Sequence, residues 1–423
     1  MIQATQVSCR SANVIFVSLA VAIFAGCTSV RMDAVYVPEA KTGAAIQKAI
    51  DKAASGGGGV VRLERGVYPS GTLYLRSNVE LNIPAGATIL GGAKPDDYDD
   101  VDDPRLGKTP ERSKKAFIVC TDGENVAVTG EGTVDGQGVG FYTAGLQANG
   151  RSFKKPPHPR PRMVQFFRCR NVRFEGIEFK DSPGWTFWIR ECEDVSVSRL
   201  RIHGDQRMIN NDGLHIDGCR RVSIRNCDIR TGDDCIIMRA NRTKGTELAC
   251  EDMTVTDCTL DSACQCVRLS CPADDTIRCG RFIRLKMSGN NGVLSAHPLR
   301  YVPVWSEGYA KMEDIVFEDC DIDVRGRAIG FWVDPGVRLR DFGNVTFRDV
   351  RIRSAKPLLL QGTADAPLRN LRFENVRGTI AEVEPIEMKA VENVTFDDCA
   401  ITSAKGQSVP FVRKTSDSWE SDR

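Results

Sequence analysis

The sequence lacks any excess of charge. Its 423 residues contain 57 Lys and Arg against 56 Asp and Glu, a formal net charge of +1. Surfaces that bind nucleic acid are strongly basic, so this composition gives no support for a nucleic-acid partner. The apolar share of 41% is enough for a substantial core. The length suits one large domain or two ordinary ones.

The sequence also lacks, near its N-terminus, an apolar run long enough to span a membrane. The run from Val14 to Phe24 is shorter than the ~20 residues that a spanning helix needs. It follows a sparse positive region at Arg10 and ends in FAGC, which resembles a bacterial lipobox. Residues 1–27 are therefore predicted to be an export signal with Cys27 as the lipidated residue. We expect an exported bacterial protein, lipid-anchored at the cell surface or in the periplasm. An ordinary secretory signal is the alternative.

Sixteen cysteines in an exported chain would suggest disulfides, but a repeat explains their spacing better. After residue 160 a polar residue is repeatedly followed by apolar residues at positions +1, +3, +6 and +8. This frame starts at Asn171, Asp194, Arg221, Asp252, Asp314, Asn344 and Asn393, is incomplete at Asn370, and is blurred near Phe282. The starts lie about 23 to 32 residues apart, which is typical of a solenoid.

Each frame is predicted to form two short strands with a bend between them, because apolar and polar residues alternate. Stacked copies would make one continuous core that no single copy could form. Eight cysteines share two frame positions: Cys227, Cys258, Cys320 and Cys399 at +6, and Cys169, Cys192, Cys219 and Cys250 two residues before a frame. We interpret them as interior stacks of reduced thiols, since free cysteine packs as a small apolar residue. Disulfides are the less favoured interpretation.

The region before residue 100 has a different pattern. Residues 43–54 place Ala and Ile on one helical stripe and precede a SGGGG segment and strand-like runs. A short helix there could cover the exposed end strand of a solenoid. We therefore predict an all-β solenoid over residues 28–403, capped by this helix, and a polar tail at 404–423.

Three aspartates stand close to glycines in neighbouring frames. Asp212 lies in NNDG, and Asp233 and Asp234 follow in TGDD one solenoid turn later. Adjacent turns lie about 4.8 Å apart, so the three carboxylates meet if they occupy equivalent places. In a straight strand Asp233 and Asp234 would point to opposite faces, but Gly232 would permit a bend that exposes both. The alternative is that these aspartates only cap turns.

Several stretches together resemble glycoside hydrolase family 28, the polygalacturonase-related enzymes: residues 43–89, RPRMVQFFRCRNVRFEGIEFKDSPGWTFW, NNDG and TGDDC. The last two are the more specific part, and the resemblance spans roughly residues 40 to 400. It implies a right-handed, single-stranded parallel β-helix, and hydrolysis with inversion at the anomeric carbon without a cofactor or metal. It also implies Asp233 as general acid, and Asp212 and Asp234 as the pair that holds the attacking water.

The sequence departs from this family at other motifs. Polygalacturonases usually carry Gly-His-Gly on the next turn, where this chain has SACQCVRLS, and Arg-Ile-Lys one turn later, where it has NNGVLSAHP. His215 stands where a second family aspartate often follows the first. We predict that Asn210, His215, Gln265 and Arg268 bind substrate, with Arg268 replacing a lost cation against a uronate carboxylate. A solvated strand residue is the alternative for Arg268.

The expected partner is a pectin-like polysaccharide or oligosaccharide of galacturonate or rhamnogalacturonan type. We expect a monomer that meets the membrane only through its lipid anchor. The basic loop at residues 151–162 could attract an anionic glycan, although a solvated loop is the simpler interpretation. A polysaccharide lyase, with a base and often calcium, and a non-catalytic glycan-binding protein remain as alternative functions.

Overall fold

The computed structural model of the protein describes residues 34–101, 103, 113–241, 248–272, 274–301, 310–382 and 384–414. The predicted signal and its lipidation site, Cys27, lie outside these residues. Within them, no helix combines the length and the apolar character needed to cross a membrane.

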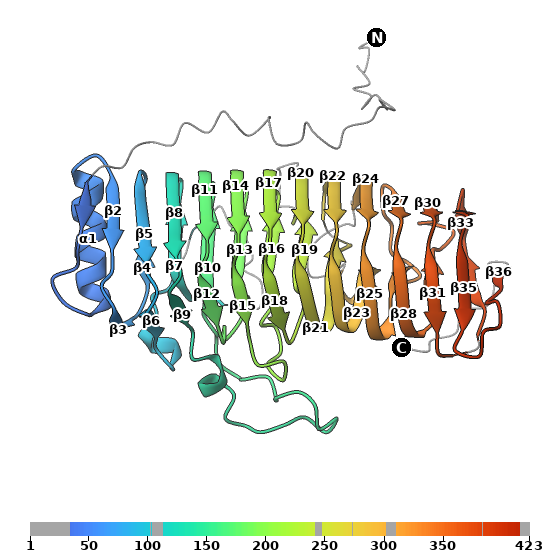
Figure 1. Cartoon of the computed structure of the whole chain (residues 1–423), viewed down its shortest axis with the longest axis horizontal. Helices are drawn as coiled ribbons and strands as arrows, with labels where there is room; N and C mark the ends of the chain where they lie inside the picture. Colours follow the sequence, from blue (N-terminus) through green and yellow to red (C-terminus); the bar gives the residue numbers. More distant parts are fainter. Residues whose placement is uncertain are drawn as a thin grey trace, which may run out of the picture. The chain divides into compact units, whose positions relative to one another are not determined.

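The described residues after residue 34 form a parallel β-helix, as the repeats predict (Figure 1). One sheet takes strands from successive turns: β1 (Val35–Tyr36), β2 (Gly59–Arg62), β5 (Val79–Ile83), β8 (Glu124–Gly130), β11 (Arg170–Glu175), β14 (Glu193–Ser198), β17 (Arg220–Arg225), β20 (Ala249–Thr256), β22 (Thr276–Ile283), β24 (Lys311–Glu318), β27 (Phe342–Arg348), β30 (Leu368–Glu374) and β33 (Val391–Glu392), with β34 (Thr395–Asp397) beside β30.

The second sheet contains the other strands of the same turns. They are β3 (Gly66–Ser70), β4 (Leu73–Tyr74), β6 (Ala87–Gly91), β7 (Ala116–Thr121), β9 (Thr133–Asp135), β10 (Arg162–Phe167), β12 (Glu178–Lys180), β13 (Phe187–Arg190), β15 (Arg201–His203), β16 (Leu214–Asp217), β18 (Asp228–Thr231), β19 (Ile236–Arg239), β21 (Thr259–Leu269), β23 (Lys286–His297), β25 (Asp321–Arg327), β26 (Ile329–Val333), β28 (Arg351–Lys356), β29 (Leu359–Gln361), β31 (Arg377–Ile380), β32 (Ile386–Lys389), β35 (Ala400–Ser403) and β36 (Phe411–Lys414).

The polar residue that opens each frame has a left-handed backbone conformation. Asn171, Asp194 and Asn344 have φ values of 53°, 56° and 56°. A second left-handed residue, such as Asn226 or Asp349, stands between the two strands of a frame. Among residues that carry a side chain, Asn and Asp tolerate this conformation best. The bend at each frame therefore has a local cause in the sequence.

Equivalent positions of successive turns stack inside the solenoid. Phe282, Phe317, Phe347, Phe373 and Phe396 form one stack, with neighbouring ring centroids 4.5 to 5.3 Å apart. The frame near Phe282 is blurred because Cys279 takes the left-handed position, with φ of 53°, and Gly280 takes the first apolar one. The stacks belong to one continuous apolar core.

The predicted thiol stacks are confirmed. Every cysteine in the described ranges is free, and of the two predicted sets only Cys399 is not fully buried. Direct contacts join neighbours, as where the backbone N–H of Cys169 donates to Sγ of Cys192 at 3.3 Å. Consecutive turns therefore pack thiol against thiol.

The solenoid has structured ends. Helix α1 (Gly43–Ser55) begins after Thr42, whose hydroxyl accepts from the backbone N–H of Ala45 at 3.3 Å, and its buried residues include Ile46 and Ile50. At the other end, β36 pairs in parallel with β32. Strand β36 lies within residues 404–423, which were predicted to be a polar tail. Apolar residues near the strand, such as the buried Val409, extend the core by one more turn, so this segment is not a polar tail throughout.

We predict that a chain starting at residue 28, denatured without reductant, reacts with close to 14 equivalents of a thiol reagent, the number of described cysteines. The native protein should react at far fewer sites, because most of these thiols are buried. Spectrophotometric thiol counting before and after addition of guanidinium makes the measurement. Nearly complete oxidation of the denatured chain would show that the stacks are disulfides instead.

Candidate active site

Asp212 and Asp234 begin neighbouring turns at the same register. Strands β16 and β19 pair in parallel with Leu214 opposite Ile236, and the two aspartates stand two residues before these positions. The backbone N–H of Gly213 donates to the carbonyl of Asp234 at 2.8 Å, which ties the two turns together. Both side chains are buried, with Asp212 4% and Asp234 1% exposed.

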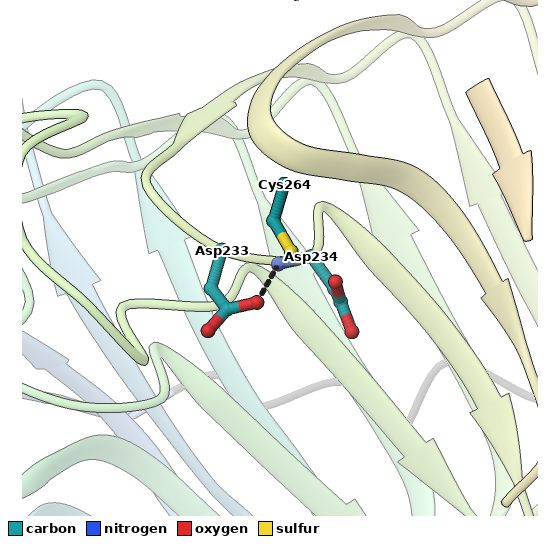
Figure 2. A group of neighbouring side chains, drawn as sticks. All are labelled: Asp233, Asp234 and Cys264. Atoms are coloured by element: carbon teal, nitrogen blue, oxygen red, sulfur yellow. Dashed lines mark hydrogen bonds between the residues drawn. The ribbon is translucent and has the colours of Figure 1, made fainter. Parts of the chain in front are cut away.

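Asp233 and Asp234 lie in the bend between β18 and β19, not within a strand. Glycine at position 232 lets the bend pack closely against the backbone of Met208, because a Cβ at this position would lie 2.0 Å from the Met208 carbonyl oxygen. The hydroxyl of Ser262 on the next turn donates to the Asp233 carbonyl at 2.7 Å and fixes the bend. Figure 2 shows the two side chains side by side, and their carboxylate oxygens come within 4.8 Å of each other.

The carboxylate of Asp233 is half-buried and held by backbone and amide donors. Its Oδ1 accepts from the backbone N–H of Asp234 at 3.1 Å. Its Oδ2 accepts from the backbone N–H of Asn210 at 3.2 Å and from that residue's Nδ2 at 3.4 Å. These donors orient the carboxylate while leaving it partly open to a ligand.

Asn210 is itself fixed by a clamp that the sequence did not reveal. Arg160, only 5% exposed, donates from Nη2 to Oδ1 of Asn210 at 3.0 Å, and from Nη1 to the carbonyl of Ile209 at 2.6 Å. The hydroxyl of Tyr142 also donates to the Ile209 carbonyl at 2.6 Å. Arg160 belongs to the basic loop that was a candidate for attracting glycan. No sequence pattern links it to Asn210, 50 residues away.

Asp234 lies in a strongly perturbed environment. Burial, followed by the charge of Asp233, raises the pKa of Asp234 to about 8. Nη1 of Arg268 lies 3.4 Å from its Oδ2 and opposes this rise without cancelling it. Its Oδ1 is buried and has no hydrogen-bond partner among the described residues. Asp234 therefore keeps its proton at neutral pH.

Arg268 reaches this pair from the next turn. It lies on β21 opposite Ile237, which lies opposite His215 on β16, so three turns contribute to one row of the sheet. Its side chain is 17% exposed, and its guanidinium carbon lies 5.9 Å from the ring centre of Tyr301. Arg268 is thus a contact of the site and not a solvated strand residue.

His215 is paired with Asp212 beneath an aromatic ring. Its Nε2 lies 2.9 Å from Oδ2 of Asp212, and its ring stacks on Trp185 with centroids 3.5 Å apart. Burial lowers the pKa of His215 well below its usual value, and nearby arginines lower it further. Trp185 and Trp188 are 7% and 0% exposed and pack together, so neither offers a free face to a sugar.

Gln265 lies at the edge of the site, next to Cys264. Its Oε1 accepts from Sγ of Cys264 at 3.1 Å, and its side chain is largely buried. Cys264 joins Asp233 and Asp234 in the one group of three metal-ligating side chains found in the described part of the chain (Figure 2). Oxygen and sulfur ligands suit a zinc-like cation, but Arg268 beside Asp234 opposes a second positive charge there.

Hydrogen bonds and strand register thus bring together six predicted site residues: Asn210, Asp212, His215, Asp233, Asp234 and Arg268. Gln265 adjoins them through Cys264. The Arg160 and Tyr142 clamp and the Trp185 support are additions that the sequence did not indicate.

The perturbed carboxyl generates a prediction about stability. The pKa of Asp234 is about 8 in the folded protein, but the carboxyl ionises near its ordinary value of 3.8 in the unfolded chain. Because the folded state binds the extra proton between these values, this group lowers the free energy of unfolding progressively as pH rises from about 4 to 8. Asp234→Asn removes the charge at every pH.

We therefore expect Asp234→Asn to melt at a higher temperature than the wild type at pH 8, with the advantage shrinking towards pH 4. Melting curves at pH 4, 6 and 8 measure the trend. Asp228→Asn, which removes an exposed carboxylate from the same turn, is the control. A pH-independent difference between Asp234→Asn and wild type would contradict the assigned pKa.

Comparison with known proteins agrees with the motifs. Residues 103–259 match the family model described as glycosyl hydrolases family 28. A probable polygalacturonase of Arabidopsis thaliana is 32% identical over 127 residues, 30% of this chain and 25% of that protein. An endo-polygalacturonase of Pectobacterium carotovorum subsp. carotovorum is 23% identical over 367 residues, 79% of this chain and 83% of that protein. The matched segments span only about a quarter of the first plant relatives.

Solved structures share the fold. A family 28 exopolygalacturonase of Yersinia enterocolitica aligns with a TM-score of 0.71 and 17% identity, over 90% of this chain and 78% of that chain. An exopolygalacturonase from Thermotoga maritima aligns with a TM-score of 0.66 and 19% identity, over 89% of this chain and 88% of that chain. The matched family segment, set within this shared β-helix, confirms that the chain is related to glycosyl hydrolase family 28.

Proposed function

We propose that the protein hydrolyses glycosidic bonds in a pectin-like glycan of galacturonate or rhamnogalacturonan type, with inversion at the anomeric carbon. The observation that carries this proposal is the aspartate cluster. Asp234 keeps a proton at neutral pH beside Asp233 on a single bend, and Asp212 begins the neighbouring turn at the register of Asp234. The family-model match includes all three residues.

Inverting hydrolysis needs one protonated carboxyl and one carboxylate base on opposite sides of the bond. Asp233 is the more exposed of the two, so it reaches the leaving oxygen and delivers the proton, which passes to it from Asp234. Asp212 and Asp234 are buried at equal register on adjacent turns, and together they hold the attacking water. The water gives its proton to this pair as its oxygen bonds to the anomeric carbon. These roles agree with those that the family resemblance implies.

Arg268 supports an anionic substrate. Its guanidinium carries a permanent positive charge, its side chain is 17% exposed, and guanidinium groups bind carboxylates in well-defined geometry. A uronate carboxylate placed there would compete with Asp234 for the guanidinium. The family-model match ends at residue 259, before Gln265 and Arg268. The substrate contacts proposed for the next turn therefore lie outside the segment that the family model matches.

A lyase is less well supported than a hydrolase. Elimination needs a base that removes the proton beside the uronate carboxyl. His215 is the only histidine paired to the described cluster, and it is 3% exposed beneath Trp185.

Lipidation at Cys27 stays a prediction that concerns location and not chemistry.

We expect Asp233→Asn to lower the turnover rate by a factor of about 10² to 10⁴, the usual contribution of a positioned general acid. Asn keeps the shape of the side chain but delivers no proton. The measurement is reducing-end release from a panel of pectic glycans, with Asp228→Asn as the matched surface control. Asp212→Asn and Asp234→Asn should also impair turnover, and the losses should not multiply because the groups act as one unit.

Proton NMR of the first product distinguishes the mechanisms. Inversion of the anomeric centre is expected, whereas retention would overturn the assigned roles. Products that absorb in the ultraviolet would identify a lyase. Binding without turnover by the wild type across the panel would identify a glycan-binding protein, and full activity of Asp233→Asn would remove the proposed mechanism.

A further inference from the structure

We propose that His215 is a positioning residue, which orients Asp212 and keeps it ionised for water activation through a hydrogen bond backed by Trp185. This inference rests on the proposed hydrolytic function, because it assigns a task within the same site. It differs from the sequence prediction, which placed His215 among the residues that bind substrate.

Burial decides between these two roles. His215 and Asp212 are 3% and 4% exposed, so the imidazole has little surface to offer a sugar. Its Nε2 instead lies 2.9 Å from Oδ2 of Asp212, within normal hydrogen-bond distance. The side chain of His215 therefore contacts the carboxylate and not the substrate.

The direction of this hydrogen bond follows from charge. Three arginines from three turns, Arg162, Arg239 and Arg268, oppose protonation of His215, which is already disfavoured by burial. The imidazole is neutral and carries hydrogen on one nitrogen only. A carboxylate accepts, so Nε2 carries the hydrogen and donates it to Asp212. A donor bonded to the charged form favours that form, so the bond stabilises ionised Asp212.

Trp185 fixes the ring that makes this bond. The indole and imidazole stack at a centroid distance of 3.5 Å with planes 17° apart. Arg162 also packs near the Trp185 ring, with its guanidinium carbon 5.7 Å from the ring centre. A catalytic group holds its geometry only when the residues around it are themselves locked. The contacts run from Arg162 through Trp185 and His215 to Asp212.

The residue type at 215 has a chemical consequence. An aspartate, which often stands here in the family, would add a fourth carboxylate to Asp212, Asp233 and Asp234. Mutual repulsion would then push further protons onto the cluster. Histidine replaces that negative charge by a neutral donor, so one carboxylate can stay ionised while the pair on the next turn keeps its proton.

The test compares two substitutions of His215. His215→Gln places an amide N–H near the former Nε2, whereas His215→Leu has similar bulk and no donor. We expect His215→Leu to lower kcat about 10- to 100-fold, the scale of a lost hydrogen bond to a charged group, with KM little changed. The acidic limb of its kcat profile should move to higher pH, because Asp212 takes up a proton more readily. His215→Gln should restore most of kcat and return the limb.

A second measurement reads the same effect without turnover. Carboxyl ¹³C NMR of aspartate-labelled protein, with Asp212→Asn to assign the signal, should show Asp212 titrating at higher pH in His215→Leu than in wild type. These variants leave unchanged the other charged groups that face His215 and Asp212, which are Arg162, Arg239 and Arg268. They also leave Tyr142 unchanged, whose hydroxyl interacts with the charge of Asp212. If His215→Leu does not fold, His215→Asn, whose amide stops short of Asp212, replaces it.

The outcomes separate this inference from the proposed function. A rise in KM with kcat and both titrations unchanged would show that His215 binds substrate, and would overturn the positioning role. Equal losses in the Gln and Leu variants without any shift in the Asp212 titration would also overturn it, by showing a purely structural role. A wild type inactive on every glycan would reject the proposed hydrolysis, while the NMR shift would still establish the hydrogen bond's effect on Asp212.

Discussion

The strict register between parallel strands is the constraint on which the rest of this protein depends. Neighbouring turns place equivalent residues about 4.8 Å apart, close enough for side chains to touch and too close for unbalanced charges to coexist. Inside the solenoid this spacing stacks phenylalanines and thiols. At the bend before β19 it brings the buried Asp212 and Asp234 to equal positions. The core and the site are thus two results of the same spacing.

Concentrated carboxylates impose a cost that the surrounding residues offset in different ways. Asp233 receives backbone and amide donors, which orient its carboxyl group. Asp234 is buried with one arginine contact and keeps a proton instead. The third carboxylate, Asp212, faces a neutral histidine. Three chemically identical side chains consequently occupy three different environments, which is the division of roles that acid–base hydrolysis requires.

Much of the fold could be predicted from the sequence because its causes are local. Alternation of apolar residues marks the strands, and the polar residue that opens each frame, such as Asn344, takes the left-handed conformation that Asn and Asp tolerate. The meeting of Asp212 with Asp234 was equally predictable, since one turn separates them. The Arg160 clamp was not, because nothing local ties that arginine to Asn210 on a distant segment. The burial of His215 also depends on Trp185, which reaches it from the neighbouring turn.

One row of the second sheet shows how such a site can change without loss of the fold. His215, Ile237 and Arg268 follow each other at equal register on β16, β19 and β21. Each turn contributes one side chain to this row, while residues on the opposite side of each strand fill the core. A substitution in the row alters the site and leaves the stacks of the interior in place. The aspartates lie in the bend that precedes the row, held by backbone contacts such as that between Gly213 and Asp234. The geometry therefore allows substrate contacts to differ from turn to turn while the carboxylate geometry persists.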